Sequence, residues 1–149
     1  GKPLIHIPTV DALAYNLAGN RDIICPLMDA RRNQTYTGLY RFDGNQMEII
    51  KPQCAVGIDE IIAEVNKLGQ AVVFLGDGVA VFEAYIRENC TVPYTFAPAH
   101  VNKQRAGAVA ALGEIYYTEG KTETAEEHKP DYLRLSQAER ERLEGEQKK

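Results

Sequence analysis

The sequence has no long apolar run and no tryptophan among its 149 residues. A helix that crosses a bilayer needs roughly 20 consecutive apolar residues, and none of the apolar stretches approaches that length. The apolar stretch at residues 4–7 is interrupted by His6, ends before Pro8 and is too short for a signal peptide. The sequence therefore predicts neither a membrane protein nor a secreted one, and a cytoplasmic location is expected.

Cysteine and serine are scarce. Cys25, Cys54 and Cys90 are odd in number, far apart and outside any CxxC motif. This spacing favours reduced thiols over a redox or metal-binding role. Ser136 is the only serine, and no GxSxG motif is present. A serine hydrolase therefore has no support in the sequence.

Positive charge is not concentrated anywhere along the chain. The net charge is -4, and the basic residues are interspersed with acids, so direct binding to nucleic acid is not expected. His6, His100 and His128 form no HExxH motif and have no visible acid or nucleophile partner. Surface or locally hydrogen-bonded histidines are expected. The sequence thus predicts no catalytic residue, no metal site and no cofactor.

The hydrophobic pattern predicts an α/β fold. Alternating segments joined by the Asp43-Gly44 turn come first, and helical stripes then alternate with short apolar runs. The predicted elements are strands over 23–28, 34–42 and 46–50, a helix over 58–68, a strand over 71–75, a helix over 79–89, a strand over 94–96 and a helix over 102–118. Pro26 predicts a bulge or an edge position for the first strand.

The resulting order, βββ-α-β-α-β-α, combines antiparallel strands with crossovers that require parallel pairing. It predicts a mixed sheet flanked by helices, in the order of a ribonuclease-H-like or actin-like (ASKHA) lobe. A short strand over 4–8 and a helix over 10–18, with Thr9 as its cap, fall outside this unit. Residues 130–135 are expected to be extended, and a charged, solvated helix is expected to start at Ser136.

Asp29 follows a buried strand, a position that serves metal or phosphate chemistry in many α/β folds. In actin-like ATPases the acid at such a hairpin is followed by glycine, which lets the backbone approach a phosphate. Here Ala30 and Arg31 follow. We therefore favour a hairpin tip, with a local bond from Asp29 to Arg31 or to the backbone, over a phosphate site.

The stretch "GDGV" begins at Gly76 and joins a strand to a helix. A helix N-terminus can hold an anion, but GxGxxG and GxxxxGKS are both absent and Asp77 would repel phosphate. A tight strand-to-helix turn is the favoured interpretation, and a small-ligand module that uses Gly76-Asp77-Gly78 is the alternative.

Four segments, taken in order, resemble the second half of the bacterial TsaB (YeaZ) family. They are "PLIHIPTVDALAYNL", "PLMDARRNQTYTGLYRF", "GDGV" and "KPDYLRL". The most specific parts are Asp29-Ala30-Arg31 with Tyr36, and the segment that contains Tyr132 and Arg134. The candidates for an interaction or a structural motif are Asp29, Arg31, Tyr36, Tyr132 and Arg134.

The resemblance implies a two-lobed, catalytically degenerate actin-like protein. Such a protein would act as a scaffold for its paralogue TsaD, together with the ATPase TsaE, in making N6-threonylcarbamoyladenosine at position 37 of tRNA. The resemblance is also compatible with a homodimer. The same superfamily carries the label peptidase M22, which this sequence does not support with protease residues. The alternative is an actin-like ATPase or M22-type metallopeptidase whose catalytic residues lie in another lobe.

The resemblance also implies a domain organisation. The family's first lobe, with an "IDTS"-like strand and a "GxGSFTGxR" loop, has no counterpart in this sequence. We therefore expect residues 1–20 to be the end of a missing first actin-like lobe, residues 21–135 to be the second ribonuclease-H-like lobe, and residues 136–149 to be a charged tail. We therefore expect this chain to be truncated at its N-terminus relative to the family.

Overall fold

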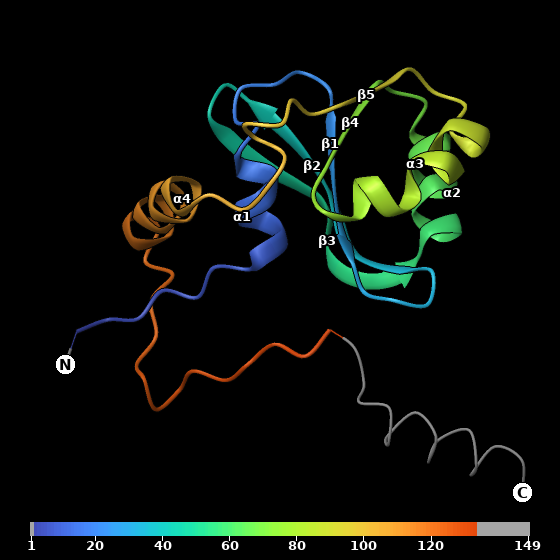
Figure 1. Cartoon of the computed structure of the whole chain (residues 1–149). Helices are drawn as coiled ribbons and strands as arrows, with labels where there is room; N and C mark the ends of the chain where they lie inside the picture. Colours follow the sequence, from blue (N-terminus) through green and yellow to red (C-terminus); the bar gives the residue numbers. More distant parts are fainter. Residues whose placement is uncertain (1, 134–149) are drawn as a thin grey trace, which may run out of the picture.

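A computed structural model describes residues 2–133 of the chain, and Figure 1 shows its arrangement. The elements are α1 (Thr9–Tyr15), β1 (Ile23–Asp29), β2 (Gln34–Asp43), β3 (Gln46–Gly57), α2 (Ile58–Leu68), β4 (Val72–Leu75), α3 (Gly78–Asn89), β5 (Tyr94–Phe96) and α4 (Ala106–Thr118). From β1 onward this is the predicted order βββ-α-β-α-β-α, which is confirmed. The helix predicted from Ser136 lies outside the described residues.

The five strands form one mixed sheet in the order β3-β2-β1-β4-β5. The first three strands pair antiparallel, and β4 pairs parallel with both β1 and β5. Figure 1 shows α2 and α3 on one side of the sheet, and α1 and α4 on the other. The predicted α/β fold with helices flanking a mixed sheet is therefore confirmed.

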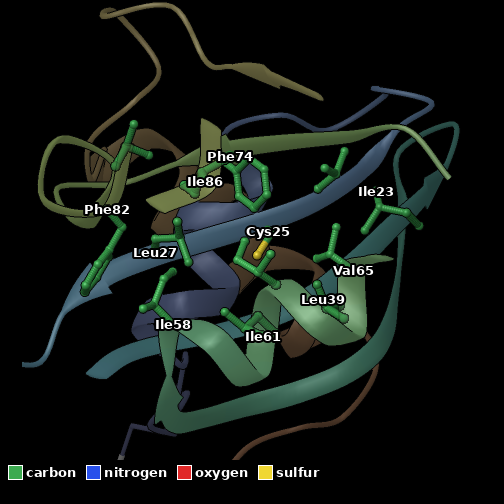
Figure 2. Packing of buried hydrophobic residues seen from close by; sticks show 13 residues of the cluster. Ile23, Cys25, Leu27, Leu39, Ile58, Ile61, Val65, Phe74, Phe82 and Ile86 are labelled. Atoms are coloured by element: carbon green, nitrogen blue, oxygen red, sulfur yellow. The ribbon is translucent and has the colours of Figure 1, made fainter. Parts of the chain in front are cut away.

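Strand β1 is apolar as far as Met28, and residues 23–27 are buried because both faces of the strand are covered there. Ile23, Cys25 and Leu27 point to the core beneath α2 and α3, whereas Ile24 belongs to the core beneath α1. Figure 2 shows the first of these clusters around Cys25. Burial raises the pKa of the Cys25 thiol to about 12, so this thiol stays protonated and unreactive at neutral pH.

Pro26 was predicted to lie at a bulge or an edge, but it lies in the middle strand of the sheet. The register of the β1–β2 ladder is the same on both sides of it, so neither alternative is found in that ladder. The β1–β2 ladder is interrupted between the pairs Ile24–Tyr40 and Leu27–Thr37, where proline has no N–H to donate. The neighbouring β2–β3 ladder shifts register twice, between Thr37 and Leu39 and between Leu39 and Tyr40. The sheet thus accommodates the proline by a local break in pairing.

Several predicted boundaries were wrong for reasons of tertiary structure. Residues 4–8 form a single bridge, Leu4–Glu123, instead of a strand. Strand β3 continues past the predicted end at residue 50 because it pairs with β2 as far as Gly57. Helix α1 stops at Tyr15, and the side chain of Asn16 donates hydrogen bonds to the carbonyls of residues 101 and 103. These bonds fix the loop before α4, which therefore starts at residue 106 instead of 102.

Helix α2 has the bounds that its stripe of isoleucines predicts. Gly57 donates its backbone N–H to the Glu60 carboxylate at 3.2 Å, which satisfies one of the free donors at the start of the helix. Gly69 ends the helix in the left-handed conformation, with φ of 63°. None of the helices in residues 2–133 is long and apolar enough to cross a membrane.

Candidate functional site

The β1–β2 hairpin tip holds two of the predicted site residues. Arg31 donates its backbone N–H to Asp29 Oδ1 at 2.8 Å, and Arg31 Nη1 lies 3.8 Å from Asp29 Oδ2. Both local bonds expected for Asp29 are present, so its carboxylate is already engaged. The Arg31 side chain is 86% exposed, and an ion pair at that exposure contributes little to stability. The tip therefore presents a cation to solvent.

The backbone of this tip is unusual. Arg31, Arg32 and Asn33 have φ values of 64°, 54° and 58°, so three consecutive non-glycine residues are left-handed. Each such residue costs about 1–2 kcal/mol relative to the right-handed conformation. The turn closes through hydrogen bonds from Ala30 N to the Gln34 carbonyl and from Gln34 N to the Arg31 carbonyl, both 3.0 Å long. Strain of this kind is typical of functional surfaces.

The structure brings two other predicted residues, Tyr36 and Tyr132, together. Both line a cavity of about 390 Å³ between β2, the segment before α1 and the C-terminal segment. Gln53 of β3 donates a hydrogen bond to Asp131 at 2.9 Å, which holds that segment against the sheet. Tyr132 remains 82% exposed. Arg134, the fifth predicted residue, lies outside the described residues.

Sequence reasoning missed a buried carboxylate in α1, next to Val10, which lines this cavity. Asp11 of α1 is only 3% exposed. It accepts hydrogen bonds from Tyr40 Oη at 2.6 Å and from Tyr116 Oη at 3.2 Å. Burial raises the pKa of Asp11, and the two tyrosine hydrogen bonds partly oppose that shift. Burial, reinforced by the Asp11 charge, also raises the pKa of both tyrosines.

Gly38 is what lets Tyr40 reach Asp11. A Cβ atom at Gly38 would lie 2.6 Å from Tyr40 Oη, so the tyrosine ring lies directly over this glycine. The network joins α1 and α4, the two helices on this side of the sheet, to strand β2. The sequence carries only a weak signal for this network: Asp11 lies next to an apolar helical stripe, and Gly38 precedes Tyr40 by two residues.

Two of the three histidines, His6 and His128, lie close together in space. The Leu4–Glu123 bridge joins the N-terminal segment to the segment after α4. This bridge brings His6 close to His128, with the two rings 5.4 Å apart, and within the segment after α4 His128 Nδ1 lies 2.8 Å from Glu123 Oε1. The sequence showed no acid partner, and His128 has one; because Glu123 is only five residues away, the expectation of a locally hydrogen-bonded histidine is confirmed for His128. The proximity of His6 to His128, in contrast, joins segments more than 100 residues apart, which no local motif could reveal.

The Gly76-Asp77-Gly78 stretch is a tight strand-to-helix turn, which is the interpretation that the sequence favoured. Gly76 has a φ of 110° and donates its N–H to both the backbone and side-chain oxygens of Asn102, each at 2.9 Å. A Cβ at Gly76 would lie 2.1 Å from the Leu27 carbonyl oxygen. Packing against β1 therefore explains this glycine without a ligand. Asp77 is exposed and lines a cavity of about 300 Å³.

Comparison with known proteins gives this arrangement a context. The family model described as "TsaD: tRNA N6-adenosine threonylcarbamoyltransferase" matches residues 1–142. A Bacillus subtilis (strain 168) protein, "tRNA threonylcarbamoyladenosine biosynthesis protein TsaB", is 29% identical over 139 residues, which is 92% of this chain. The chain belongs to the TsaB/YeaZ family. The family that the motifs around Asp29 and Tyr132 predicted is thereby confirmed.

Two solved structures show the same fold as this TsaB/YeaZ chain. Both come from Pseudomonas aeruginosa: a protein with similarity to peptidase YeaZ, at 16% identity, and YeaZ itself, at 15%. Each superposes with a TM-score of 0.66. The chain spans 58% of the Bacillus subtilis protein and 60% of each of these two structures. At this identity the structural likeness concerns the fold.

Proposed function

We propose that this protein is a non-catalytic subunit of the machinery that makes N6-threonylcarbamoyladenosine at position 37 of tRNA. In this role it is a scaffold for the paralogue TsaD, working with the ATPase TsaE in the cytoplasm. The observation that carries the proposal is the family match over residues 1–142, and the Bacillus subtilis relative supports it by its name. Neither a cofactor nor direct contact with tRNA is part of the proposal.

The hairpin supports the non-catalytic part of the proposal. Ala30 and Arg31 stand where actin-like ATPases have the glycine that admits a phosphate. The carboxylate of Asp29, moreover, is held by the Arg31 backbone and faces its guanidinium. An engaged carboxylate beside a Cβ-bearing, strained turn is poorly suited to nucleotide chemistry and well suited to a fixed contact surface.

Beyond the contacts expected from the first lobe, we assign additional contacts with partner proteins to the surface that carries Arg31, Tyr36 and Tyr132. Arg134, which lies outside the described residues, stays a candidate from its sequence alone. Arginine and tyrosine are enriched in binding hot spots, and here Arg31 and Tyr132 are exposed whereas Tyr36 is half-buried. Residues 1–20 are proposed to continue a first actin-like lobe and residues 21–135 to form the second, with 136–149 as a tail. Within the described residues, α1 packs on the sheet and α4 contacts α1, so this side of the sheet is the proposed junction between lobes.

Co-elution with TsaD in size-exclusion chromatography tests the proposal. We expect a chain extended by the family's first lobe to co-elute with TsaD, because the resemblance places the contact helices in that lobe. The 149-residue chain alone is expected to bind more weakly by about tenfold or more, since each 1.4 kcal/mol of lost contact is tenfold in affinity. The absence of co-elution for both chains would contradict the scaffold role.

Equal binding by both chains would place the interface in this lobe. In that case Arg31→Ala and Tyr36→Ala are expected to weaken binding about tenfold. Arg21→Ala is the matched control, because Arg21 is also an exposed arginine on this domain but lies outside the proposed surface.

A second candidate function is an actin-like enzyme, either an ATPase or a metallopeptidase. The name of the matching family, which is that of a transferase, favours an enzyme in general, and the description of one similar structure, which mentions a peptidase, favours the metallopeptidase. Calorimetric titration with ATP–Mg²⁺ separates the two functions. A scaffold is expected to show no binding without its partners, whereas saturable binding by the extended chain alone would favour the enzyme.

A further inference from the structure

His6, Glu123 and His128 converge between the N-terminal segment and the segment after α4. The three side chains each offer one ligand atom, and these atoms all lie within 4.8 Å of one another. All three residues are half-buried, so the side chains are neither packed immobile nor fully solvated. From this geometry we propose that His6, Glu123 and His128 bind a divalent transition metal ion of the zinc type.

The ligand types set the class of metal. Two imidazoles and one carboxylate form a mixed nitrogen and oxygen set, which suits Zn²⁺, Co²⁺ or Ni²⁺ and does not suit Ca²⁺ or Mg²⁺. Two histidines with one glutamate are also a known ligand set for zinc sites that keep one position open. The site proposed here is independent of the scaffold role proposed above.

The distances fit a small closing movement. Ligand atoms about 2.1 Å from a tetrahedral zinc lie about 3.4 Å from one another. Glu123 Oε1 and His128 Nδ1 are already 2.8 Å apart, so an ion would separate them slightly and replace their hydrogen bond. The ligand atom of His6 lies at most 4.8 Å from those of Glu123 and His128, so it needs to move only slightly closer. The side chains of His128 and Glu123 are 34% and 28% exposed and have room to turn.

The surroundings leave an approach for water or a ligand. His6 and Glu123 line a cavity of about 350 Å³, together with Tyr116 and Lys121. The Lys121 ammonium is paired with Glu119 at 2.7 Å and lies 4.3 Å from the centre of the Tyr116 ring. Its charge is thus directed to other partners, while Glu123 supplies the negative charge that compensates the ion.

Such an ion would fasten two segments that have few other links. Residues 2–8 have no regular secondary structure and reach the segment after α4 through the Leu4–Glu123 bridge. Because that bridge uses backbone atoms, replacing the Glu123 side chain leaves it in place. Binding of an ion to the folded chain alone would therefore raise its thermal stability in proportion to the logarithm of metal concentration.

Calorimetric titration of the full 149-residue chain with Zn²⁺ tests the site, with Co²⁺ as a spectroscopic probe of tetrahedral coordination. The titration uses a Cys54→Ser, Cys90→Ser background, so that the half-buried thiols cannot bind the ions. We expect one ion per chain. His6→Ala and His128→Ala are each expected to weaken binding by at least about 100-fold, because removing a ligand exceeds the 10–100-fold effect of removing its outer partners.

His100→Ala is the matched control and is expected to bind like the parent, since His100 is exposed and lies outside the cluster. Glu123→Gln is the second variant; it keeps the shape of the side chain and its backbone bridge and is expected to weaken binding by a similar factor. Circular dichroism establishes that each variant is folded. The absence of saturable binding by the parent, or binding that His6→Ala and His128→Ala leave unchanged, would overturn the proposal.

Discussion

Replacing Asp11 by alanine is expected to lower the free energy of unfolding by about 3–5 kcal/mol. The change leaves the buried hydroxyls of Tyr40 and Tyr116 without their common acceptor, and each unsatisfied group costs about 1–3 kcal/mol. Urea unfolding monitored by circular dichroism measures the loss. Tyr116→Phe is the milder comparison, because it removes the longer of the two hydrogen bonds, at 3.2 Å, and leaves Tyr40 bonded.

The same carboxylate predicts a pH dependence with a definite sign. Burial raises the pKa of Asp11 in the folded state above its usual value of about 4. Between these two values the folded chain binds more protons than the unfolded chain. The contribution of Asp11 to stability is therefore greatest below about pH 4, falls as the pH rises through the folded pKa, and is constant above it.

Asp11→Asn isolates that contribution. The amide oxygen can still accept the hydrogen bond from Tyr40, and the amide N–H can donate to Tyr116, but the side chain no longer ionises. We expect the stability of Asp11→Asn relative to the parent chain to rise with pH across this window. A difference that does not change with pH, or a loss as large as that of Asp11→Ala, would contradict the account.

Local sequence was enough to predict the sheet and most of its helices. The apolar run at Ile23, the alternation around Tyr36 and the isoleucine stripe of α2 each carry their own periodicity. The helix stop at Gly69 is also a local signal, because the left-handed conformation there favours glycine. The formation of such elements depends on residues that are neighbours in the sequence. For that reason the predicted order of strands and helices was correct.

Features that depend on distant segments were missed. Helix α4 starts at residue 106 because Asn16 and Gly76 hold the loop before it, and neither contact leaves a trace in the α4 sequence. The Asp11 network and the His6–Glu123–His128 cluster likewise arise when α1 and the ends of the described chain meet on one side of the sheet. The hairpin part of the candidate site was thus predictable, because Asp29 and Arg31 are close in sequence. The Asp11 network and the histidine cluster were not, because their residues come from distant segments.

Gly76→Ala is expected to cost about 3–5 kcal/mol of stability, although it adds a single methyl group. The new Cβ would lie 2.1 Å from the Leu27 carbonyl oxygen, and Leu27 belongs to the central strand. Overpacking of this kind costs about 1–3 kcal/mol, and a residue with a side chain at φ of 110° adds about 1–3 kcal/mol of backbone strain. Urea unfolding measures the total.

Gly69→Ala separates the two causes. Gly69 also has a positive φ, of 63°, but a Cβ there would meet nothing within 4 Å. This variant therefore experiences only the strain of the left-handed conformation, and we expect a loss of about 1 kcal/mol. A loss for Gly76→Ala no larger than for Gly69→Ala would mean that the 76–78 turn can move away from β1. Gly76 would then no longer be explained by packing, and the small-ligand interpretation of this turn would gain support over the structural one.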